Sequence, residues 1–167
     1  MSLTSIFHEL GIQYVVVMPD SRMVSAISKE ACEKEGIEYI QALTEQDAAS
    51  ISAGLNLVGK LSVCAMENSG IRSACDLISR LELLNRIHNV FLLTNRGMIG
   101  EENWWGAYHG DVTNSVLNEL RIKNKVIKDV QEFRVGLKKA LETFRTEQVS
   151  VALLLDYDFF EDLNGDA

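Results

Sequence analysis

The sequence predicts an α/β fold: a doubly wound, mainly parallel six-stranded sheet with helices on both faces. Short apolar runs rich in β-branched residues recur along the chain, and longer stretches with helical spacing separate them, so that strand and helix alternate about six times. This alternation is typical of a parallel sheet that is covered on both faces. The expected strands are residues 14–18, 38–42, 62–66, 90–94, 125–127 and 149–155.

The clearest helical pattern runs from Val130 to Phe144, where apolar residues recur on one face and lysines lie on the other. A second stretch with this spacing covers residues 69–84, and a third follows Thr44 over residues 48–58. No repeat, low-complexity segment or Pro/Gly/Ser-rich linker interrupts the chain. We therefore expect one domain over residues 1–167.

The charge balance excludes some classes of partner. A total of 16 Lys and Arg against 24 Asp and Glu gives a net charge of -8, and no basic cluster occurs. Nucleic acid and anionic membrane surfaces are therefore poor partners. No apolar run reaches the roughly 20 residues that span a bilayer, and the first ten residues lack the pattern of a signal peptide. We expect a cytoplasmic protein.

The three cysteines, Cys32, Cys64 and Cys75, are odd in number and widely spaced. Neither a disulfide framework nor a CxxC metal or redox motif can be drawn from them, and we interpret them as small buried hydrophobic residues. The three histidines are too scattered to form a metal cluster on their own. The sequence predicts no metal site in this chain.

Polar residues follow several of the predicted strands, which matters because ligands of such folds bind beyond the carboxyl ends of the strands. Four places are candidates for a site: Pro19-Asp20-Ser21, Thr44-Glu45, Glu67-Asn68-Ser69-Gly70, and the segment from Asn95 to Gly110.

Structural roles would also account for three of these places. Thr44 can cap the following helix, and Glu45 then lies favourably at the positive end of the helix dipole. Glu67 to Gly70 suits a backbone turn that approaches a ligand closely, but Ser69 could equally serve as the acceptor of a helical first turn. Asp20 and Ser21 could cap the next helix. The residue types alone leave both interpretations open.

The segment from Asn95 to Gly110 favours a functional role more strongly. It contains both tryptophans, Arg96, two acids and His109 in what we predict to be a loop, and such a loop is too long for a simple connection. Loops of this composition at the carboxyl end of a strand usually contact a ligand or a partner.

Taken together, these residues resemble the pyrimidine-binding domain of thiamine diphosphate enzymes, and within that group the sulfopyruvate and phosphonopyruvate decarboxylases. Four motifs occur in the family's order, and the similarity extends from about Gly11 to Leu155. Gly100-Glu101 and the later Gly110 look closer to the sulfopyruvate alpha subunit. The matching motifs are Pro19-Asp20-Ser21, Thr44-Glu45 through Ala53-Gly54 to Gly59-Lys60, Glu67-Asn68-Ser69-Gly70 and Arg96-Gly97.

The resemblance implies a role for each strand-end motif. Glu45 would hydrogen-bond a ring nitrogen of the cofactor's aminopyrimidine and act as the catalytic carboxyl group, which requires a carboxyl group able to share a proton in a water-poor interface. Asn68, Ser69 and Gly70 would line the pyrimidine side of the cofactor. The residues implied on the substrate side, for a small anionic 2-oxoacid, are Asp20, Ser21, Arg96, Glu101 and His109.

The resemblance also implies a partner. The family holds the cofactor's diphosphate through Mg2+ bound by a Gly-Asp-Gly motif in a second domain, and this sequence contains no Gly-Asp-Gly; Asn164-Gly165-Asp166 is the nearest approach to it. We therefore expect a separate diphosphate-binding beta subunit that binds the Mg2+, and an α2β2 or higher hetero-oligomer with the active site between subunits.

Two departures from the family pattern leave the reaction open. Glu67 stands where the family has Gln, and the family's His position falls at Gly106 when the sequences are aligned on Gly110. The first expectation is a 2-oxoacid decarboxylase subunit. An acyloin-forming carboligase subunit is the alternative within the superfamily, and a catalytically silent regulatory or scaffold subunit is the alternative outside enzymes.

Overall fold

In the computed structural model, which describes residues 2–165, six strands form one parallel sheet in the order β2-β1-β3-β4-β6-β5. The predicted fold class is confirmed, and all six strands lie within two residues of their predicted bounds. Met1 and residues 166–167 of the expected domain lie outside the described residues. The strands are β1 (Tyr14–Val17), β2 (Glu38–Gln41), β3 (Ser62–Glu67), β4 (Val90–Thr94), β5 (Lys123–Ile127) and β6 (Val151–Leu155).

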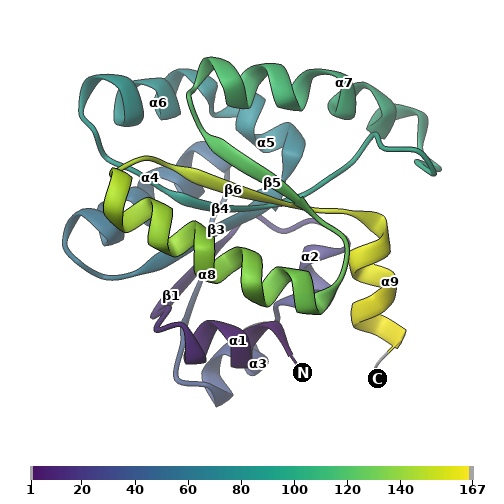
Figure 1. The fold of residues 1–167 in the computed structure, drawn as a ribbon, viewed down its shortest axis with the longest axis horizontal. Coiled ribbons are helices and arrows are strands. Elements are labelled where there is room, and N and C mark those ends of the chain that lie inside the picture. The colour runs from purple at the N-terminus through teal and green to yellow at the C-terminus, as the bar shows by residue number, and fades with distance from the viewer. Residues whose placement is uncertain (1, 166–167) are drawn as a thin grey trace.

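Helices cover both faces of the sheet, as Figure 1 shows. One face carries α1 (Leu3–Glu9), α2 (Met23–Ala26), α3 (Lys29–Lys34), α8 (Val130–Glu147) and α9 (Tyr157–Gly165). The other face carries α4 (Glu45–Leu57), α5 (Asn68–Ser73), α6 (Cys75–Ser79), a π-helical turn (Arg80–Leu84) and α7 (Trp104–Glu119). None of these helices is long and apolar enough to cross a bilayer, within the part of the chain that the structure describes.

Each central strand contributes to two apolar clusters because successive side chains point to opposite faces. Val15 and Val17 pack on the α8 face, whereas Val16 packs on the α4 face. The strands therefore consist of nearly continuous apolar runs, as expected where both faces are buried. Cys32 and Cys64 are fully buried and Cys75 is partly buried, so the interpretation of the cysteines as small core residues is confirmed for the first two.

Two predicted boundaries are wrong. The stretch 69–84 is not one helix, because the backbone leaves helical geometry at Ala74, between α5 and α6. Ile71, Ala74 and Ile78 are nevertheless all buried, so the apolar spacing persists across the break and resembles a continuous helix.

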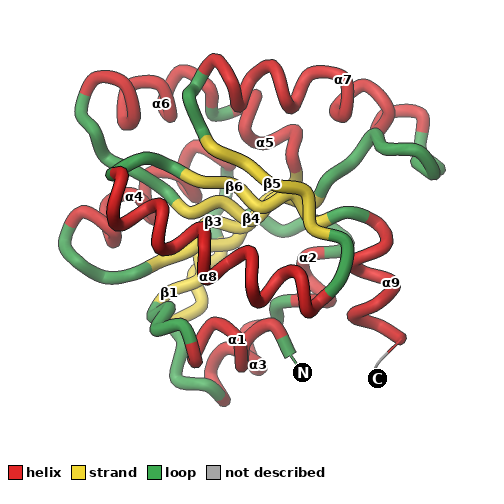
Figure 2. The backbone as a smooth tube through the Cα atoms, in the orientation of Figure 1, coloured by secondary structure: helices red, strands yellow, loops and turns green. Residues whose placement is uncertain are grey.

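The segment 95–110 is a loop only as far as Asn103, because α7 begins at Trp104. Figure 2 shows the shorter loop between β4 and α7. Gly106 and Gly110 lower the helix propensity of this stretch and concealed the helix from the sequence pattern. The structure requires Gly97 in the loop: it has a positive φ of 83°, and a Cβ there would lie 2.6 Å from the carbonyl oxygen of Ala107.

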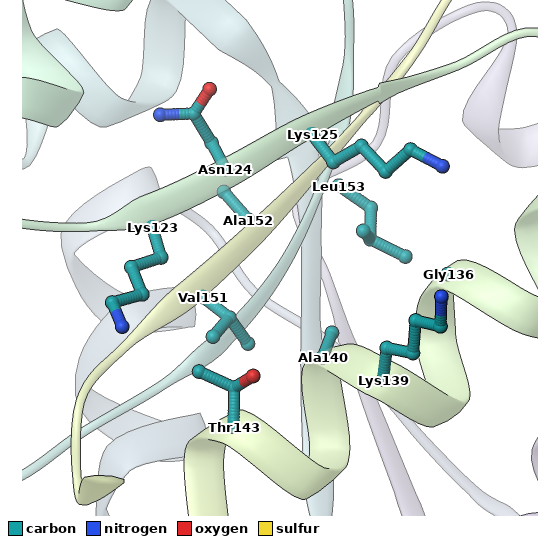
Figure 3. Close-up of a pocket in the computed structure, with 10 residues that line it drawn as sticks. All are labelled: Lys123, Asn124, Lys125, Gly136, Lys139, Ala140, Thr143, Val151, Ala152 and Leu153. Atoms are coloured by element: carbon teal, nitrogen blue, oxygen red, sulfur yellow. The ribbon is translucent and has the colours of Figure 1, made fainter.

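A hollow of about 160 Å³ lies between β5, β6 and α8, toward the amino ends of the two strands (Figure 3). Its floor is apolar and its rim carries Lys123, Lys125 and Lys139. Lys123 and Lys125 pair with Glu147 and Glu132 of α8. Lysines on an edge strand discourage pairing with another sheet, and their stems cover apolar surface. None of the predicted site residues lines this hollow.

Candidate active site at the carboxyl edge of the sheet

The sheet order brings three of the four predicted motifs side by side. β1 lies between β2 and β3. After β1 the chain adds β2 on one side of it, and after α4 it adds β3 on the other side. The strand order therefore reverses between β1 and β3, and the carboxyl ends of these two strands are the switch point of the fold. The register pairs Val17 with Ala65 and Glu67 with Thr94. Residues that follow β1, β3 and β4 therefore gather at one edge.

Glu45 is the first residue of α4. The hydroxyl of Thr44 accepts a hydrogen bond from the backbone N–H of Asp47 at 3.1 Å, so the predicted helix cap is confirmed. The Glu45 side chain is half-buried and accepts a hydrogen bond from the hydroxyl of Ser73 at 3.3 Å. Capping by Thr44 thus leaves the Glu45 carboxylate directed toward α5, with one described hydrogen-bond donor.

Gly70 allows α5 to approach this carboxylate. A Cβ at Gly70 would lie 2.6 Å from Cγ of Glu45 and 2.6 Å from the sulfur of Met66. Real Cβ atoms do not come this close to other heavy atoms, so any side chain at position 70 would displace Glu45 or Met66. The φ of Gly70 is not positive, so the backbone conformation does not require glycine here. The close approach of α4 and α5 does.

Asn68 is 1% exposed and lies beside the Gly70 turn. Its amide nitrogen donates to the carbonyl oxygen of Arg96 at 2.9 Å, which ties the end of β3 to the end of β4. Its side-chain oxygen is buried and has no hydrogen-bond partner. One interpretation of the sequence made Ser69 the cap of this helix. That interpretation is wrong, because the Ser69 hydroxyl donates a hydrogen bond to Glu67 at 2.7 Å.

Asp20 joins the end of β1 to the end of β4. One carboxylate oxygen accepts the backbone N–H groups of Arg22 and Met23, at 2.9 and 3.0 Å, and the other accepts the hydroxyl of Thr94 at 2.9 Å. Ser21 is exposed beside it. Asp20 therefore caps the turn before α2, as the sequence allowed, while lying at the same edge as Asn68.

Arg96 and Glu101 form a buried ion pair. The guanidinium donates two hydrogen bonds of 2.8 Å to the carboxylate, and the two side chains are only 8% and 5% exposed. Glu101 also accepts the backbone N–H of Gly97 at 3.1 Å and of Asn103 at 3.0 Å, and the hydroxyl of Tyr157. The Arg96 guanidinium, helped by these donors, holds the pKa of Glu101 far below its usual range despite burial.

Glu67 and His109 extend this network. Glu67 lies 3.5 Å from Arg96, and its other oxygen lies 3.7 Å from Nε2 of His109. Glu67 therefore shares the positive charge of Arg96 with Glu101, which is the nearer partner. On the opposite side of its ring, Nδ1 of His109 lies 3.4 Å from the guanidinium of Arg72.

Tyr157 and Arg72 escaped the sequence analysis, and Tyr108 was included only as part of the segment from Asn95 to Gly110. Tyr157 directly follows β6 and Asp156, so the rule of strand ends could have found it. Arg72 and Tyr108 lie within helices, where nothing in their spacing sets them apart. The Arg72 guanidinium lies 4.9 Å from the centre of the Tyr108 ring.

The chemistry of the edge fits an aminopyrimidine. Such a ring offers both donors and acceptors, and the edge supplies a half-buried carboxylate at Glu45 and an orphaned buried oxygen at Asn68. The absence of a side chain at Gly70 lets the Glu45 side chain pack directly against α5. Among the described residues, no group of three His, Cys, Asp or Glu side chains could hold a metal ion.

Comparison with known proteins finds relatives of the kind that the motifs resemble. The chain is 22% identical over 152 residues to the sulfopyruvate decarboxylase subunit alpha of Methanothermobacter thermautotrophicus, covering 91% of this chain and 92% of that subunit. The corresponding subunit of Methanocaldococcus jannaschii is 24% identical over 161 residues, covering 96% and 95%. The chain resembles the sulfopyruvate decarboxylase alpha subunit. This confirms the predicted resemblance, although no protein-family model matches the chain.

Solved structures show the same fold. A Mycobacterium smegmatis protein described as thiamin diphosphate-dependent matches with a TM-score of 0.71 and 14% identity, covering 97% of this chain and 31% of that one. A split-gene transketolase, solved as an inactive beta4 tetramer, matches with a TM-score of 0.66 and 21% identity, covering 91% and 48%. Benzoylformate decarboxylase from Polynucleobacter necessarius gives 0.65 and 17%, covering 97% and 30%. The chain thus spans a third to a half of these chains.

Proposed function

We propose that this chain is the alpha subunit of a two-subunit, thiamine diphosphate-dependent 2-oxoacid decarboxylase, active only with a separate diphosphate-binding beta subunit. The observation that carries the proposal is the junction of Glu45, Asn68 and Gly70. The Glu45 side chain packs against Gly70 of α5, where no Cβ fits, and the buried side-chain oxygen of Asn68, two residues earlier on the same helix, has no hydrogen-bond partner. The sulfopyruvate decarboxylase names of the relatives support it.

Each part of the edge then has a task. When bound, thiamine diphosphate supplies an electron sink for loss of carbon dioxide from the oxoacid. Glu45 would hold a proton toward a ring nitrogen of the pyrimidine, and Asn68, Ser69 and Gly70 would line that ring. Asp20, Ser21, Arg96, Glu101 and His109 lie on the substrate side, where the mutually paired Arg96 and Glu101 keep the loop after β4 in place. Mg2+ is expected on the partner.

Exposed apolar side chains beside the site support a partner subunit. Trp104 is 84% exposed at the start of α7, and Ile99 is fully exposed in the loop before it. Aromatic residues in such positions are typical of the central part of protein interfaces. The proposed beta subunit would cover this surface and exclude water from Glu45.

The first test measures turnover of the assembled complex. Glu45→Gln should lower carbon dioxide release from a 2-oxoacid by about 10²- to 10⁴-fold, the usual contribution of a general acid–base group. Asp47→Asn, which removes a neighbouring charge on the first turn of α4, is the matched control and should keep activity. Unchanged turnover in Glu45→Gln contradicts the catalytic assignment and favours a silent scaffold subunit.

The same complex separates decarboxylation from carboligation. Product analysis with and without an added aldehyde distinguishes carbon dioxide and free aldehyde from an acyloin. Calorimetry with thiamine diphosphate and Mg2+ should show tight binding only after the beta subunit is added. Tight binding by this chain alone contradicts the divided site.

A second test probes the junction itself. Gly70→Ala should displace Glu45 and cost about 1–3 kcal/mol of stability through overpacking, with a loss of turnover. Gly54→Ala on α4 is the control, because a Cβ there meets nothing within 4 Å and alanine favours a helix. Equal behaviour of the two variants, measured by urea unfolding and turnover, would show that Gly70 does not set the position of Glu45.

A further inference from the structure

We infer that Arg72, rather than Arg96, binds the second anionic group of a doubly anionic 2-oxoacid substrate. This inference rests on the proposed function and names a residue that determines substrate specificity at the same site. It assigns specificity to a residue on α5 that none of the sequence motifs includes.

The positive charge of Arg96 is already paired with carboxylates of this chain. Both of its outer nitrogens contact carboxylates, with Glu101 at 2.8 Å and Glu67 at 3.5 Å, and its side chain is 8% exposed. A substrate anion at Arg96 would have to displace Glu101, which is also held by the backbone N–H groups of Gly97 and Asn103. Arg96 therefore positions the loop.

Arg72, by contrast, has a positive charge that no neighbouring carboxylate pairs with among the described residues. Its Nη1 is buried without a hydrogen-bond partner. A guanidinium nitrogen that is shielded from water and lacks an acceptor is costly, and an anion that supplies the acceptor removes this cost. Guanidinium groups match the oxygens of carboxylate, sulfonate and phosphonate groups in geometry as well as charge.

His109 and Tyr108 hold the Arg72 side chain without neutralising it. Because arginine only donates hydrogen bonds, the contact between its Nη2 and Nδ1 of His109 at 3.4 Å requires an unprotonated Nδ1. The ring proton then lies on Nε2, which faces Glu67 at 3.7 Å. Tyr108 stacks on the guanidinium at 4.9 Å, and this contact also leaves the positive charge in place.

The position of Arg72 on α5 places this charge beside the proposed cofactor residues. α5 begins at Asn68, includes Gly70 and ends at Ser73, which donates to Glu45. Arg72 therefore lies on the same short helix that lines the pyrimidine side, and α7 supplies its two side-chain contacts. A substrate that spans from the reacting carbon to Arg72 needs an anionic group at its far end.

Steady-state kinetics of the assembled complex test this role. Arg72→Gln should raise KM for 3-sulfopyruvate or phosphonopyruvate by about 10- to 100-fold with little change in kcat, the loss expected for one charge-assisted hydrogen bond. KM for pyruvate, which lacks the second anion, should stay the same. Arg72→Lys should recover part of the loss. Arg80→Gln is the matched control, since that exposed arginine pairs with Asp76 on α6.

The rival cation is Arg22, whose guanidinium lies 4.0 Å from the centre of the Tyr157 ring. If Arg22→Gln abolishes the preference for the doubly anionic substrate and Arg72→Gln does not, the inference is wrong. It is also wrong if Arg72→Gln weakens pyruvate and phosphonopyruvate equally, because a merely structural role would do so.

A binding measurement separates this inference from the proposed function. The side-chain N–H signals of the full chain's arginines should be followed by NMR during titration with methylphosphonate and methanesulfonate. We expect the Arg72 signal to shift, the Arg80 signal to stay, and the binding to vanish in Arg72→Gln. A shift in a complex that decarboxylates no oxoacid would support the anion site and reject the decarboxylase. Turnover without any shift at Arg72 would reject the anion site alone.

Discussion

Two glutamates at opposite edges of the sheet are buried to the same degree but differ in pKa. The side chains of Glu101, at the carboxyl edge, and Glu82, at the amino edge, are 5% and 6% exposed. The pKa of Glu101 is far below its usual range, because Arg96 donates two hydrogen bonds to it. The pKa of Glu82 is raised, because burial outweighs its hydrogen bonds. Burial alone therefore does not decide the charge of a buried carboxyl group.

The donors around each glutamate explain the difference. Glu101 accepts from a permanently charged guanidinium, two backbone N–H groups and the Tyr157 hydroxyl. Glu82 contacts Nδ1 of His88 at 2.8 Å and the Ser150 hydroxyl. Two polar atoms near it, Nε2 of His88 and the side-chain oxygen of Asn89, have no partner. The donors at the carboxyl edge therefore lower the pKa of Glu101, whereas burial at the amino edge raises the pKa of Glu82.

The largest expected effect comes from breaking the charged pair at the carboxyl edge. Glu101→Gln leaves Arg96 buried without its full partner and should lower the free energy of unfolding by about 3–5 kcal/mol at neutral pH. Urea unfolding measures this change. Glu102→Gln is the control, because that neighbouring acid is exposed and should change stability by less than about 0.5 kcal/mol. Similar losses in both variants would contradict the special role of the buried pair.

A smaller effect is expected at the amino edge. The Ser150 hydroxyl donates to Glu82 and accepts the backbone N–H of Asn89 at 2.5 Å. Ser150→Ala leaves that buried N–H unsatisfied and should cost about 1–3 kcal/mol of stability, again measured by urea unfolding. Ser25→Ala, at an exposed hydroxyl of α2, should cost much less. A loss in Ser150→Ala as large as that in Glu101→Gln would remove the contrast between the two edges.

The pH dependence of stability gives the smallest effect and tests the contrast most directly. The lowered pKa of Glu101 means that its contribution is present above the ordinary value of 4.5 and is lost as pH falls below it. The raised pKa of Glu82 means the reverse: its contribution is present below 4.5 and is lost as pH rises. The free energy of unfolding of the wild type, minus that of Glu101→Gln, should therefore rise with pH.

The free energy of unfolding of the wild type, minus that of Glu82→Gln, should fall with pH. For either glutamate, the slope of this difference against pH is at most about 1.4 kcal/mol per pH unit. Urea unfolding below pH 4.5 measures the slope for Glu101, and urea unfolding above pH 4.5 measures the slope for Glu82. Slopes of the same sign would show that the two carboxyl groups do not differ in protonation.

The order of strands and helices follows from the sequence alone because it depends on local periodicity. Runs such as 62–66 and 90–94 are apolar and β-branched over the length of a buried strand, so all six strands could be placed. The Thr44 cap could also be predicted, since a cap depends on residues three positions apart. The break at Ala74 and the start of α7 at Trp104 could not, because the apolar spacing continues across Ala74 and because Gly106 and Gly110 lower the helix propensity of α7.

The sequence by itself determined the fold class, the strand-end positions of Glu45 and Asn68 to Gly70, and the resemblance to the sulfopyruvate decarboxylase alpha subunit. Only the tertiary structure decided which of these side chains meet. The contact of Gly70 with Glu45 and the pairing of Arg96 with Glu101 are set by the packing of α5 and of the loop after β4 at the carboxyl edge. The contacts of Arg72 with Tyr108 and His109 depend on the packing of α7, which lies more than 30 residues away in sequence. Contacts of this kind have no local pattern, since they arise where separate elements pack together.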